Sequence, residues 1–589
     1  MGRLVVLTWF ALSVLLVLKT AHTPGGWILS TDDAMRLVQV RDLLNGQSWF
    51  DTTQWRMNAP YGLPMHWSRL VDAGIASLIL LFRLFTDAKT AETWTLYVWP
   101  LLPLLPVLLA LTHIGYRLVG RTGALLALAL GASCVAARGP FEPGNIDHHN
   151  VQLALSIGFI AFLMDIDRSR RAAIFAAITA AVSLAVGLET LPYFVAALIA
   201  LAIWWCFDGR ISANVAAFGG TLAATSVLLL GGVTASAYRI SSACDTFSGL
   251  YATLVALSGM GAALLAMQPR LDSPLRRGAA AAGLCTLVIV VAALLGPACL
   301  HGPYAHVDPR LWQVWLSGVD EVQSPFTMGL MAPGDFVGGY FYCVLAIIAL
   351  VAAVFVVRPQ HRPPMVILCA VALVAFAIAT TQLRALAFAV LFATPGMAVV
   401  ASRLLERLPI SRTASLLATL AAVLFSSDAS YAFIGERIQK SLPLSQQYTP
   451  VQEKWVRACM VPAAFGELAA LPRGRVAAFV DMGPMIIAST PHATLGGPYH
   501  RNAAGILNTY TIFAGSALEQ RATLLKRGVD YVAICTPEPD YVLWGAVARR
   551  DSLLKVDSKG GMEPWLEPLV THPHGGEVRI FRVRRDRLS

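Results

Sequence analysis

The chain has 589 residues, of which 56% are hydrophobic and 14% are charged, and its mean hydropathy is +0.61. This balance excludes a soluble globular protein and indicates a polytopic α-helical membrane protein. The net charge of +10 is typical of arginine-rich cytoplasmic loops in such proteins. We therefore expect membrane lipids, and no nucleic acid, among its partners.

Apolar stretches long enough to cross a bilayer core of roughly 30 Å follow one another along most of the chain. We predict about thirteen transmembrane helices, at residues 4–21, 95–114, 122–138, 150–165, 171–187, 190–206, 212–232, 249–267, 278–299, 336–357, 364–381, 385–402 and 413–427. The first lacks an obvious Ala-x-Ala-like cleavage site, so we interpret it as a retained helix and not as a signal peptide. The apolar segment 74–86 is interrupted by Arg83 and predicts an interfacial helix.

Arginines mark one set of alternating loops as cytoplasmic. They are Arg117, Arg121, Arg168, Arg170, Arg171, Arg210, Arg270, Arg276, Arg277, Arg358, Arg362, Arg403, Arg407 and Arg412. The other set is expected to face outward and comprises 22–94, 139–149, the turn at Gly187–Glu189, 233–248, 300–335, 382–384 and everything after 428. An odd number of spans then places the N-terminus inside and the C-terminal region outside.

The sequence changes character after residue 427, so we predict a transmembrane domain over 1–427 and a soluble mixed α/β domain over 428–589. Strand-like and helix-like runs alternate in this second part. They are Arg475–Val480, Tyr531–Ile534 and Val578–Val583 as strands, and Ser516–Arg527 as a helix. Cys459 and Cys535 both lie here and are able to form a disulfide if the domain faces an oxidising compartment.

Ionisable residues that are costly to place against hydrocarbon gather in the outward loops. They are Asp32 and Asp33 in the first loop, Asp147, His148 and His149 in the second, Glu321 before the tenth span, and Arg384 at the outer start of the twelfth. Carboxylates with an imidazole suit a divalent cation such as Mg²⁺ or Mn²⁺, and an arginine is suited to neutralise a phosphate. Together they indicate transfer of a group from a lipid-phosphate donor, with a carboxylate taking the acceptor's proton.

Each of these residues, taken alone, also has a structural explanation. Asp32 or Asp33 is suited to cap a helix that runs from Ala34, and the Asp-His-His string also precedes a helix start. Glu321 alone fits a solvated surface residue, and Arg384 alone fits a side chain that snorkels at a helix end. Their combination on one side of the membrane favours a site.

The ordered set of motifs resembles the catalytic subunits of oligosaccharyltransferases, which are membrane glycosyltransferases of the GT-C class with thirteen spans. The family's catalytic Asp, followed by a Trp-Tyr-Asp segment, looks like Asp33 followed by Trp49-Phe50-Asp51. Its archaeal Asp-His-His motif looks like Asp147-His148-His149, which implies that Asp147 and His149 are metal ligands. The family's loop Glu, in a Ser-x-Glu-x-Gln-x-Pro-like string, looks like Glu321 within 319–325, and its pyrophosphate-binding Arg looks like Arg384.

The resemblance is weaker in the C-terminal domain. The family's Trp-Trp-Asp-Tyr-Gly signature, which reads the acceptor sequon, looks like Phe479-Val480-Asp481-Met482-Gly483, where Asp and Gly remain and both Trp and the Tyr are gone. This departure favours an acceptor other than a sequon. We expect Asp481 to touch the acceptor, and His66 and Arg69 of the first loop to line the donor or acceptor groove.

The sequence as a whole predicts a glycosyltransferase of the bacterial inner membrane, with its active site and C-terminal domain in the periplasm. The donor would be a polyprenyl-linked sugar, as a monophosphate or a pyrophosphate, and the acceptor a glycan, a lipid or a protein. Asp33 is expected to be the base and a metal contact, with Asp32 as the second candidate, and Glu321 to join the cation when its loop closes. The alternatives are a flippase of lipid-linked glycans, or an assembly subunit without activity.

Overall fold

The computed structural model describes residues 1–21, 30–327, 333–407, 412–425, 427–441, 455–456, 458–570 and 577–588. Parts of three predicted regions lie outside these ranges. They are 22–29 of the first outer loop, 328–332 of the loop at 300–335, and 442–454, 457 and 571–576 of the C-terminal region.

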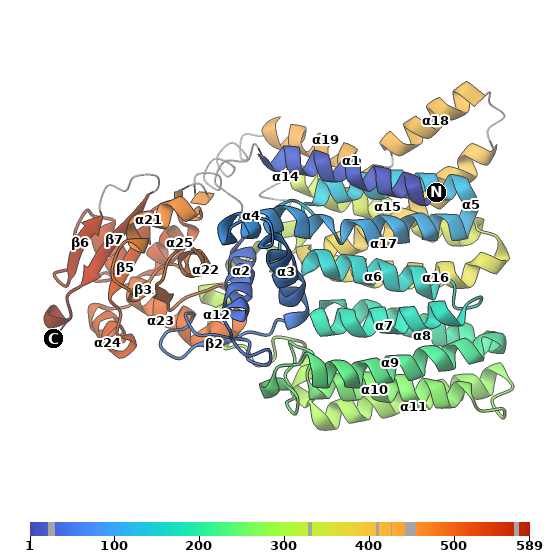
Figure 1. The fold of residues 1–589 in the computed structure, drawn as a ribbon, viewed down its shortest axis with the longest axis horizontal. Coiled ribbons are helices and arrows are strands. Elements are labelled where there is room, and N and C mark those ends of the chain that lie inside the picture. The colour runs from blue at the N-terminus through green and yellow to red at the C-terminus, as the bar shows by residue number, and fades with distance from the viewer. Residues whose placement is uncertain are drawn as a thin grey trace.

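The described residues form a bundle of long helices with a sheet-containing domain at one end (Figure 1). The bundle helices are α1 (Gly2–Ala21), α5 (Leu104–Arg138), α6 (His149–Leu163), α7 (Arg170–Val186), α8 (Leu191–Phe207), α9 (Ser212–Gly232), α10 (Gly249–Ala266), α11 (Pro274–Leu295), α15 (Tyr342–Val356), α16 (Arg362–Ala379), α17 (Leu386–Arg407) and α18 (Arg412–Phe425). Nine helical stretches among the described residues are long and apolar enough to span a membrane, and His149–Leu163 is a shorter apolar helix. The chain is therefore a multi-pass membrane protein.

Helix α5 contains two of the predicted spans, because it folds back on itself. Gly120 has a φ of 74° inside the helix, a conformation that glycine adopts without steric cost. The two arms then pack closely and run antiparallel: a Cβ on Gly115 would lie 2.4 Å from the backbone oxygen of Gly123, and one on Gly131 would lie 2.4 Å from Leu111 Cδ1. With α5 counted twice, each predicted span coincides with a helix. The N-terminus lies at the end of the bundle opposite the sheet domain (Figure 1), as an odd number of spans requires.

Three helices of the first outer loop lie between the bundle and the sheet domain (Figure 1). They are α2 (Thr31–Leu44), α3 (Arg69–Phe82) and α4 (Ala88–Val98), and a short antiparallel pair, β1 (Thr53–Gln54) and β2 (Leu63–Pro64), connects α2 to α3. Helix α3 contains the segment predicted to be interfacial and ends before Arg83. Leu37 and Val40 of α2 pack with Val71 and Ile75 of α3 and with Ile146, all buried, so this cluster fixes the loop that carries Asp147.

The C-terminal part contains a five-stranded mixed sheet in the order β4-β3-β5-β7-β6. Strands β3 (Arg475–Ala477), β4 (Ala493–Thr494) and β5 (Tyr531–Cys535) are parallel, whereas β7 (Val578–Val583) pairs antiparallel with β5 and with β6 (Leu566–Val570). The main helices here are α22 (Met482–Ser489), α23 (Ala503–Ala514), α24 (Ala517–Arg527) and α25 (Pro539–Val547). All five residues of β5 are buried, which explains its continuous apolar sequence. The predicted strands Tyr531–Ile534 and Val578–Val583 and the predicted helix are confirmed, whereas the predicted strand Arg475–Val480 is observed only over Arg475–Ala477.

Hydrogen bonds fasten this sheet domain to the first outer loop. Arg527 Nη1 donates to the carbonyl oxygens of Asn58 at 3.3 Å and Ala59 at 3.1 Å, and Arg56 Nη1 donates to the carbonyl of Thr490 at 2.9 Å. The backbone nitrogen of Ala59 donates to Thr494 in strand β4 at 3.0 Å. The first outer loop therefore serves as the seat of the sheet domain.

Two disulfides lie on the side of the bundle that bears the sheet domain. Cys459 is bonded to Cys535, the pair expected in an oxidising compartment, and Cys244 is bonded to Cys299. The sequence did not predict the second bond, because Cys244 and Cys299 lie in different loops. The remaining cysteines form no disulfide and lie in the apolar helices: Cys134, Cys206, Cys285, Cys343 and Cys369.

Candidate active site at the outer ends of the helices

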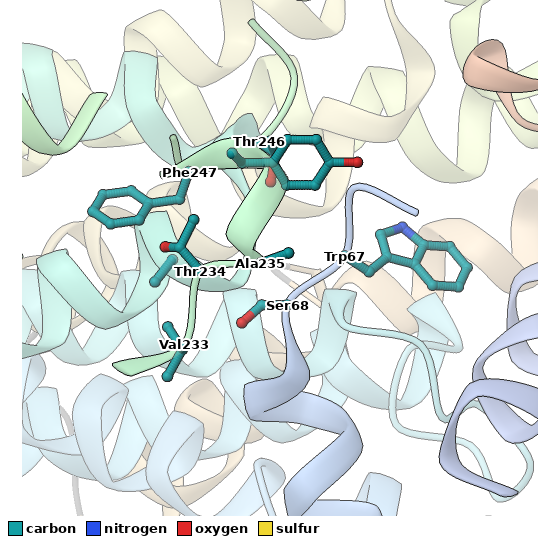
Figure 2. A pocket seen from close by; sticks show the side chains of 9 residues that line it. Trp67, Ser68, Val233, Thr234, Ala235, Thr246 and Phe247 are labelled. Atoms are coloured by element: carbon teal, nitrogen blue, oxygen red, sulfur yellow. The ribbon is translucent and has the colours of Figure 1, made fainter. Parts of the chain in front are cut away.

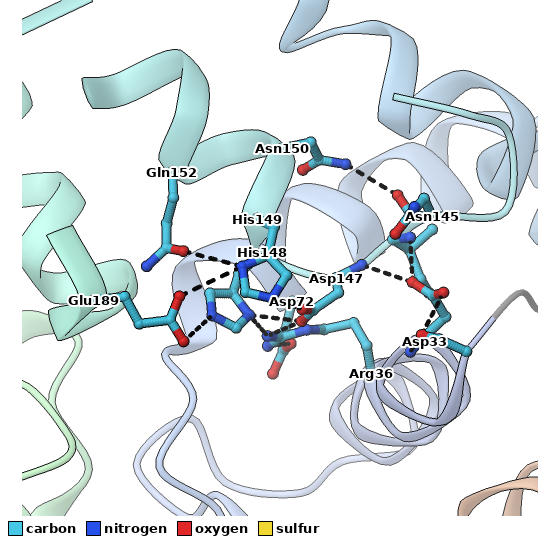
Figure 3. A network of polar contacts seen from close by, with 12 residues as sticks. Asp33, Arg36, Asp72, Asn145, Asp147, His148, His149, Asn150, Gln152 and Glu189 are labelled. Carbon is cyan, nitrogen blue, oxygen red and sulfur yellow. Dashed lines mark hydrogen bonds and ion pairs between the residues drawn. The ribbon is translucent and has the colours of Figure 1, made fainter. Parts of the chain in front are cut away.

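The Asp-His-His string lies at the start of α6 and forms the centre of a polar network (Figure 3). Asp147 is buried, and its Oδ1 lies 2.6 Å from His148 Nδ1 and accepts a bond from Arg36 Nη2 at 3.3 Å. Its Oδ2 lies 3.3 Å from His149 Nε2 and accepts no hydrogen bond. Burial opposes ionisation of Asp147, yet the charges of His148 and His149 hold its pKa well below the usual range. One carboxylate oxygen is thus fixed by the protein while the other points at an imidazole.

Asp33 holds the loop that carries Asp147. Its Oδ1 accepts from the backbone nitrogens of Ile146 at 2.7 Å and Asp147 at 3.0 Å, and its Oδ2 accepts from the Ser30 hydroxyl at 2.7 Å. Ser30, and not an aspartate, is the N-cap of α2, because its oxygen accepts from the backbone nitrogen of Asp33. Burial and the charge of Asp147 raise the pKa of Asp33 to about 7. Both oxygens of Asp33 are engaged with its own protein.

Asp32, the neighbouring residue, lies in the field of the other site acids. Burial, and then the charges of Asp147 and Glu321, raise the pKa of Asp32 well above its usual range. Tyr499 of the sheet domain closes this side: it is buried, its hydroxyl donates to the carbonyl of Thr31 at 3.2 Å, and burial and the charge of Asp32 raise its pKa. Asp32, Asp147 and Glu321 therefore come together from three outer loops.

His149 and Arg384 are connected by Glu189, at the outer start of α8. One carboxylate oxygen of Glu189 lies 3.5 Å from His149 Nδ1 and the other lies 3.6 Å from Arg384 Nη1. The Arg384 guanidinium also lies 5.8 Å from the centre of the Tyr304 ring. The segment after Glu321 docks beside Arg384, since the backbone nitrogen of Leu383 donates to the carbonyl of Gln323 at 3.0 Å. The structure thus brings Arg384 to the same site as the Asp-His-His string.

A buried ion-pair network of Arg36, Asp72 and Arg69 packs against Asp147. Arg36 Nη1 donates to Asp72 at 2.9 Å, and Arg69 Nη1 donates to the other oxygen of Asp72 at 3.0 Å. The Arg36 guanidinium also lies 4.2 Å from the centre of the Trp67 ring. Arg69 is fully buried, and its second nitrogen donates to Gln47 and to the Asp51 carbonyl. The structure therefore places Arg69 in this buried network, and its predicted contact with substrate stays a prediction.

The chain matches no protein-family model and no curated protein sequence, but it is similar to solved structures. Oligosaccharyltransferase AglB from Archaeoglobus fulgidus, in complex with an inhibitory peptide and a dolichol-phosphate, aligns with a TM-score of 0.64 at 14% identity, over 94% of this chain and 71% of AglB. The same enzyme tethered to an acceptor peptide with an NVT sequon gives a TM-score of 0.63 at 15% identity, over 94% and 71% of the two chains. Its complex with Zn and sulfate gives 0.61 at 14% identity, over 97% and 72%.

The chain has the GT-C fold. The resemblance inferred from the motif order is confirmed at the level of fold, and so is the prediction of a helical membrane protein with a C-terminal domain that contains a mixed sheet. The agreement over 94% of the chain extends from the bundle into the sheet domain. The roles of the individual site residues stay predictions.

Acidic residues of the sheet domain lie near the segment 479–483, which resembles the sequon signature. Asp481 precedes α22, and its charge reaches Tyr499 on one side and Glu538 and Asp540 on the other. Glu538 is buried and its Oε2 accepts no hydrogen bond. Burial, and then the charge of Asp540, raise the pKa of Glu538 well above its usual range. His66, the other predicted groove residue, lies in a separate cluster with His500 and Asp245.

Sequence reasoning missed Glu189, Tyr499 and Arg36. Glu189 carried a recognisable signal, because an acid at the outer end of a span is costly unless it has a partner. Tyr499 carried none, since it lies more than 450 residues from Asp32 and only the seating of the sheet domain brings it to the site. Arg36 lies one helical turn after Asp32 and Asp33, and only the position of Asp72 and Asp147 reveals its role.

Proposed function

We propose that this protein is a membrane glycosyltransferase that transfers a sugar or oligosaccharide from a polyprenyl-(pyro)phosphate donor to an acceptor outside the membrane. The observation that carries this proposal is the convergence of three outer loops. Asp147 Oδ2 lies 3.3 Å from His149 Nε2. The charges of Asp147 and Glu321 both act on Asp32, and the Glu189 carboxylate connects His149 to Arg384. A cation site beside a phosphate-binding arginine suits the loss of a phosphate leaving group.

The donor set fits a divalent cation held by Asp147 Oδ2 and His149 Nε2. Asp147 Oδ2 is buried and accepts no hydrogen bond, which is costly unless a cation completes its partners. Glu189 and Gln152 lie near His149 Nδ1, at 3.5 and 3.4 Å, and such a partner on the second ring nitrogen orients metal-binding histidines. Bound Mg²⁺ or Mn²⁺ would offset the charge that develops on the leaving phosphate.

We assign the role of base to Asp32, and the role of positioning residue to Asp33. Both carboxylate oxygens of Asp33 accept hydrogen bonds, from the 146–147 backbone and from Ser30, so Asp33 is poorly placed to take a proton. Asp32 faces Asp147 and Glu321, and a carboxylate with a raised pKa is suited to accept a proton near neutral pH. Glu321 is exposed and would complete the cation site when its segment closes over substrate.

The donor phosphate would replace Glu189 as the partner of Arg384. The guanidinium of Arg384 has a planar array of donors that matches phosphate oxygens, and Tyr304 lies beside it. Arg384 immediately precedes α17, at one end of the candidate membrane span Leu383–Arg407, where a lipid phosphate would lie. A lipid-linked sugar therefore reaches Arg384 from the bilayer while its sugar points toward Asp147.

The acceptor side is formed by the sheet domain. The charge of Asp481 acts on Tyr499 and on the pair Glu538 and Asp540, and both tryptophans of the sequon signature are absent. Acidic hydrogen-bond acceptors suit the hydroxyls of a glycan, so a cell-surface glycan or a lipid glycan is favoured over a sequon-bearing protein.

We place this side of the protein in the periplasm of a bacterium, with the bundle in the inner membrane. Cys459–Cys535 lies in the C-terminal region, and Cys244–Cys299 connects the outward loop 233–248 to the outer end of the span 278–299; disulfides persist in oxidising compartments. The arginine-rich loops belong to the opposite set, as cytoplasmic loops do. The domain boundary near residue 427 is part of the same proposal.

A flippase of lipid-linked glycans is the alternative. Transporters place their ionisable residues near the bilayer midplane, between repeats. Here the buried acids Asp33, Asp72 and Asp147 are collected in outer loops at one end of the bundle, which supports transfer chemistry over transport.

The test is a transfer assay on the full-length protein in nanodiscs. Labelled polyprenyl-linked sugars are supplied with and without Mn²⁺, and release or transfer of sugar is measured for the wild type and for Asp147→Ala. Metal-dependent turnover that Asp147→Ala abolishes is the expected result. Donor binding without turnover under any metal, unaffected by the substitution, would reject the enzyme and favour the flippase.

A further inference from the structure

A second group of metal-ligating side chains lies outside the site described above. It consists of His66 from the first outer loop, Asp245 from the loop between α9 and α10, and His500 from the sheet domain, and one ligand atom of each lies within 4.8 Å of the others. His500 Nε2 is 2.6 Å from Asp245 Oδ2, and the rings of His66 and His500 have their centres 4.9 Å apart. Three segments far apart in the sequence thus converge on one point.

Neighbouring side chains orient the members of this group as they would orient metal ligands. The Nδ1 atom of His66 is buried and has no hydrogen-bond partner, so one member of the cluster has a polar atom without a partner. Arg501 holds Asp245 from behind, with Nε donating to Oδ2 at 2.6 Å and Nη2 donating to Oδ1 at 2.5 Å, and Arg501 also donates to the Tyr238 hydroxyl. Carboxylates that ligate metals are commonly oriented by such outer hydrogen bonds.

A small cavity lies beside the loops that carry His66 and Asp245 (Figure 2). It is lined by Trp67 and Thr246, which follow His66 and Asp245 in sequence, and by Tyr238, the partner of Arg501. The Thr246 hydroxyl donates to the backbone oxygen of His66 at 2.8 Å, so the two loops are already joined beside it.

We propose that His66, Asp245 and His500 form a second cation site, selective for a borderline transition metal of the Zn²⁺ class. Two imidazoles with one carboxylate are a common ligand set for such ions, with water in the open position. Mg²⁺ prefers oxygen ligands, so this site differs in metal preference from a site that depends on carboxylates. The pairing of Asp245 with Arg501 neutralises its charge in part, and the ion would be held mainly by the imidazoles.

The position of this site gives it a task. Trp67 lies between the two clusters, with its ring centre 6.0 Å from that of His148 and 5.9 Å from that of His66. On the other side Tyr304 lies 5.3 Å from His500, and Arg384 lies over Tyr304. A cation there would fasten the sheet domain to two outer loops and fix the aromatic side chains that border the transfer site.

The experiment measures metal content, so its outcome is independent of transferase activity. Full-length protein in nanodiscs is stripped with EDTA, loaded with ZnCl₂, passed through gel filtration and analysed for zinc per chain. The variants are His500→Gln and His66→Gln, each alone and combined with Asp147→Asn. The combination removes any zinc bound at the Asp147 site. The exposed outer-loop His306, changed to Gln, is the matched control.

We expect His500→Gln and His66→Gln each to lose about one zinc per chain relative to the wild type and His306→Gln, and to melt at a lower temperature than the wild type only when zinc is present. Asp147→Asn alone should keep this zinc. Gel-filtration profiles of metal-free protein show whether a variant is folded, and the two histidines provide independent variants. Zinc content equal to that of the wild type in both histidine variants, or no zinc in the loaded wild type, would overturn the proposal.

Discussion

Adjacent aspartates with different roles allow a sharp test, because the same substitution can be made in each. In Asp33→Asn the amide oxygen still accepts from the Ile146 and Asp147 nitrogens, whose bonds are 2.7 and 3.0 Å in the native protein, and the amide nitrogen is able to donate to Ser30. What is lost is the charge assistance, worth about 1 kcal/mol across these bonds. In Asp32→Asn the only carboxylate that we assign as base is removed, which costs roughly 10²–10⁴-fold in turnover.

The expected result is therefore a large difference between two isosteric variants one residue apart. Asp33→Asn should keep turnover within about tenfold of the wild type, with any loss visible in the Mn²⁺ concentration that gives half-maximal rate. Asp32→Asn should lose turnover at saturating Mn²⁺ and donor, and should melt at or above the wild-type temperature, because it relieves repulsion with Asp147 and Glu321. Single-turnover sugar transfer in nanodiscs, with melting followed by tryptophan fluorescence, measures both. An active Asp32→Asn beside an inactive Asp33→Asn would refute the assignment.

Three further predictions rest on other contacts. Arg384→Gln should raise the KM for the donor by roughly 10- to 100-fold, since a charged hydrogen bond to phosphate is worth about 1.5–3 kcal/mol; the exposed Arg310→Gln serves as the control, and equal KM values would contradict the phosphate role. Burial and the charge of Asp540 raise the pKa of Glu538 above the usual 4.5, so the native state binds more protons than the unfolded state above that pH; the sheet domain should lose stability as pH rises from about 4.5 toward the raised pKa, and Glu538→Gln should reduce this slope in melting temperature, with Asp540, whose pKa is also raised, providing the rest. Arg36→Met removes one cationic partner from each of the buried carboxylates Asp72 and Asp147, which keep Arg69 and His148, and should cost about 1–3 kcal/mol, seen as a lower melting temperature; unchanged melting would contradict a stabilising role for Arg36.

The spans, the strands and the order of the motifs were predictable because their signals are local. An apolar run of about 20 residues crosses a bilayer whatever its neighbours are, and β5 reads as a strand because both of its faces are buried. The turn inside α5 was also predictable in effect, since Arg117 and Arg121 marked a cytoplasmic loop between two spans.

The distinction between Asp32 and Asp33 was not predictable in this way. Successive residues on a helix point about 100° apart, and only the position of the 146–147 backbone determines which carboxylate is engaged. The same holds for the partners of His66: its imidazole meets His500 because Arg527 and Arg56 seat the sheet domain on the first outer loop. Contacts between residues hundreds of positions apart leave no mark in a single sequence.

The carboxylate of Glu189 connects two binding events. It lies 3.5 Å from His149 and 3.6 Å from Arg384, so a donor phosphate that takes over Arg384 leaves this acid to His149 alone. His149 then becomes a more basic ligand, and the cation is bound more tightly. By thermodynamic reciprocity the cation strengthens donor binding by the same factor. The protein would thus bind donor and cation together. Once the lipid phosphate leaves Arg384, the cation is held less tightly.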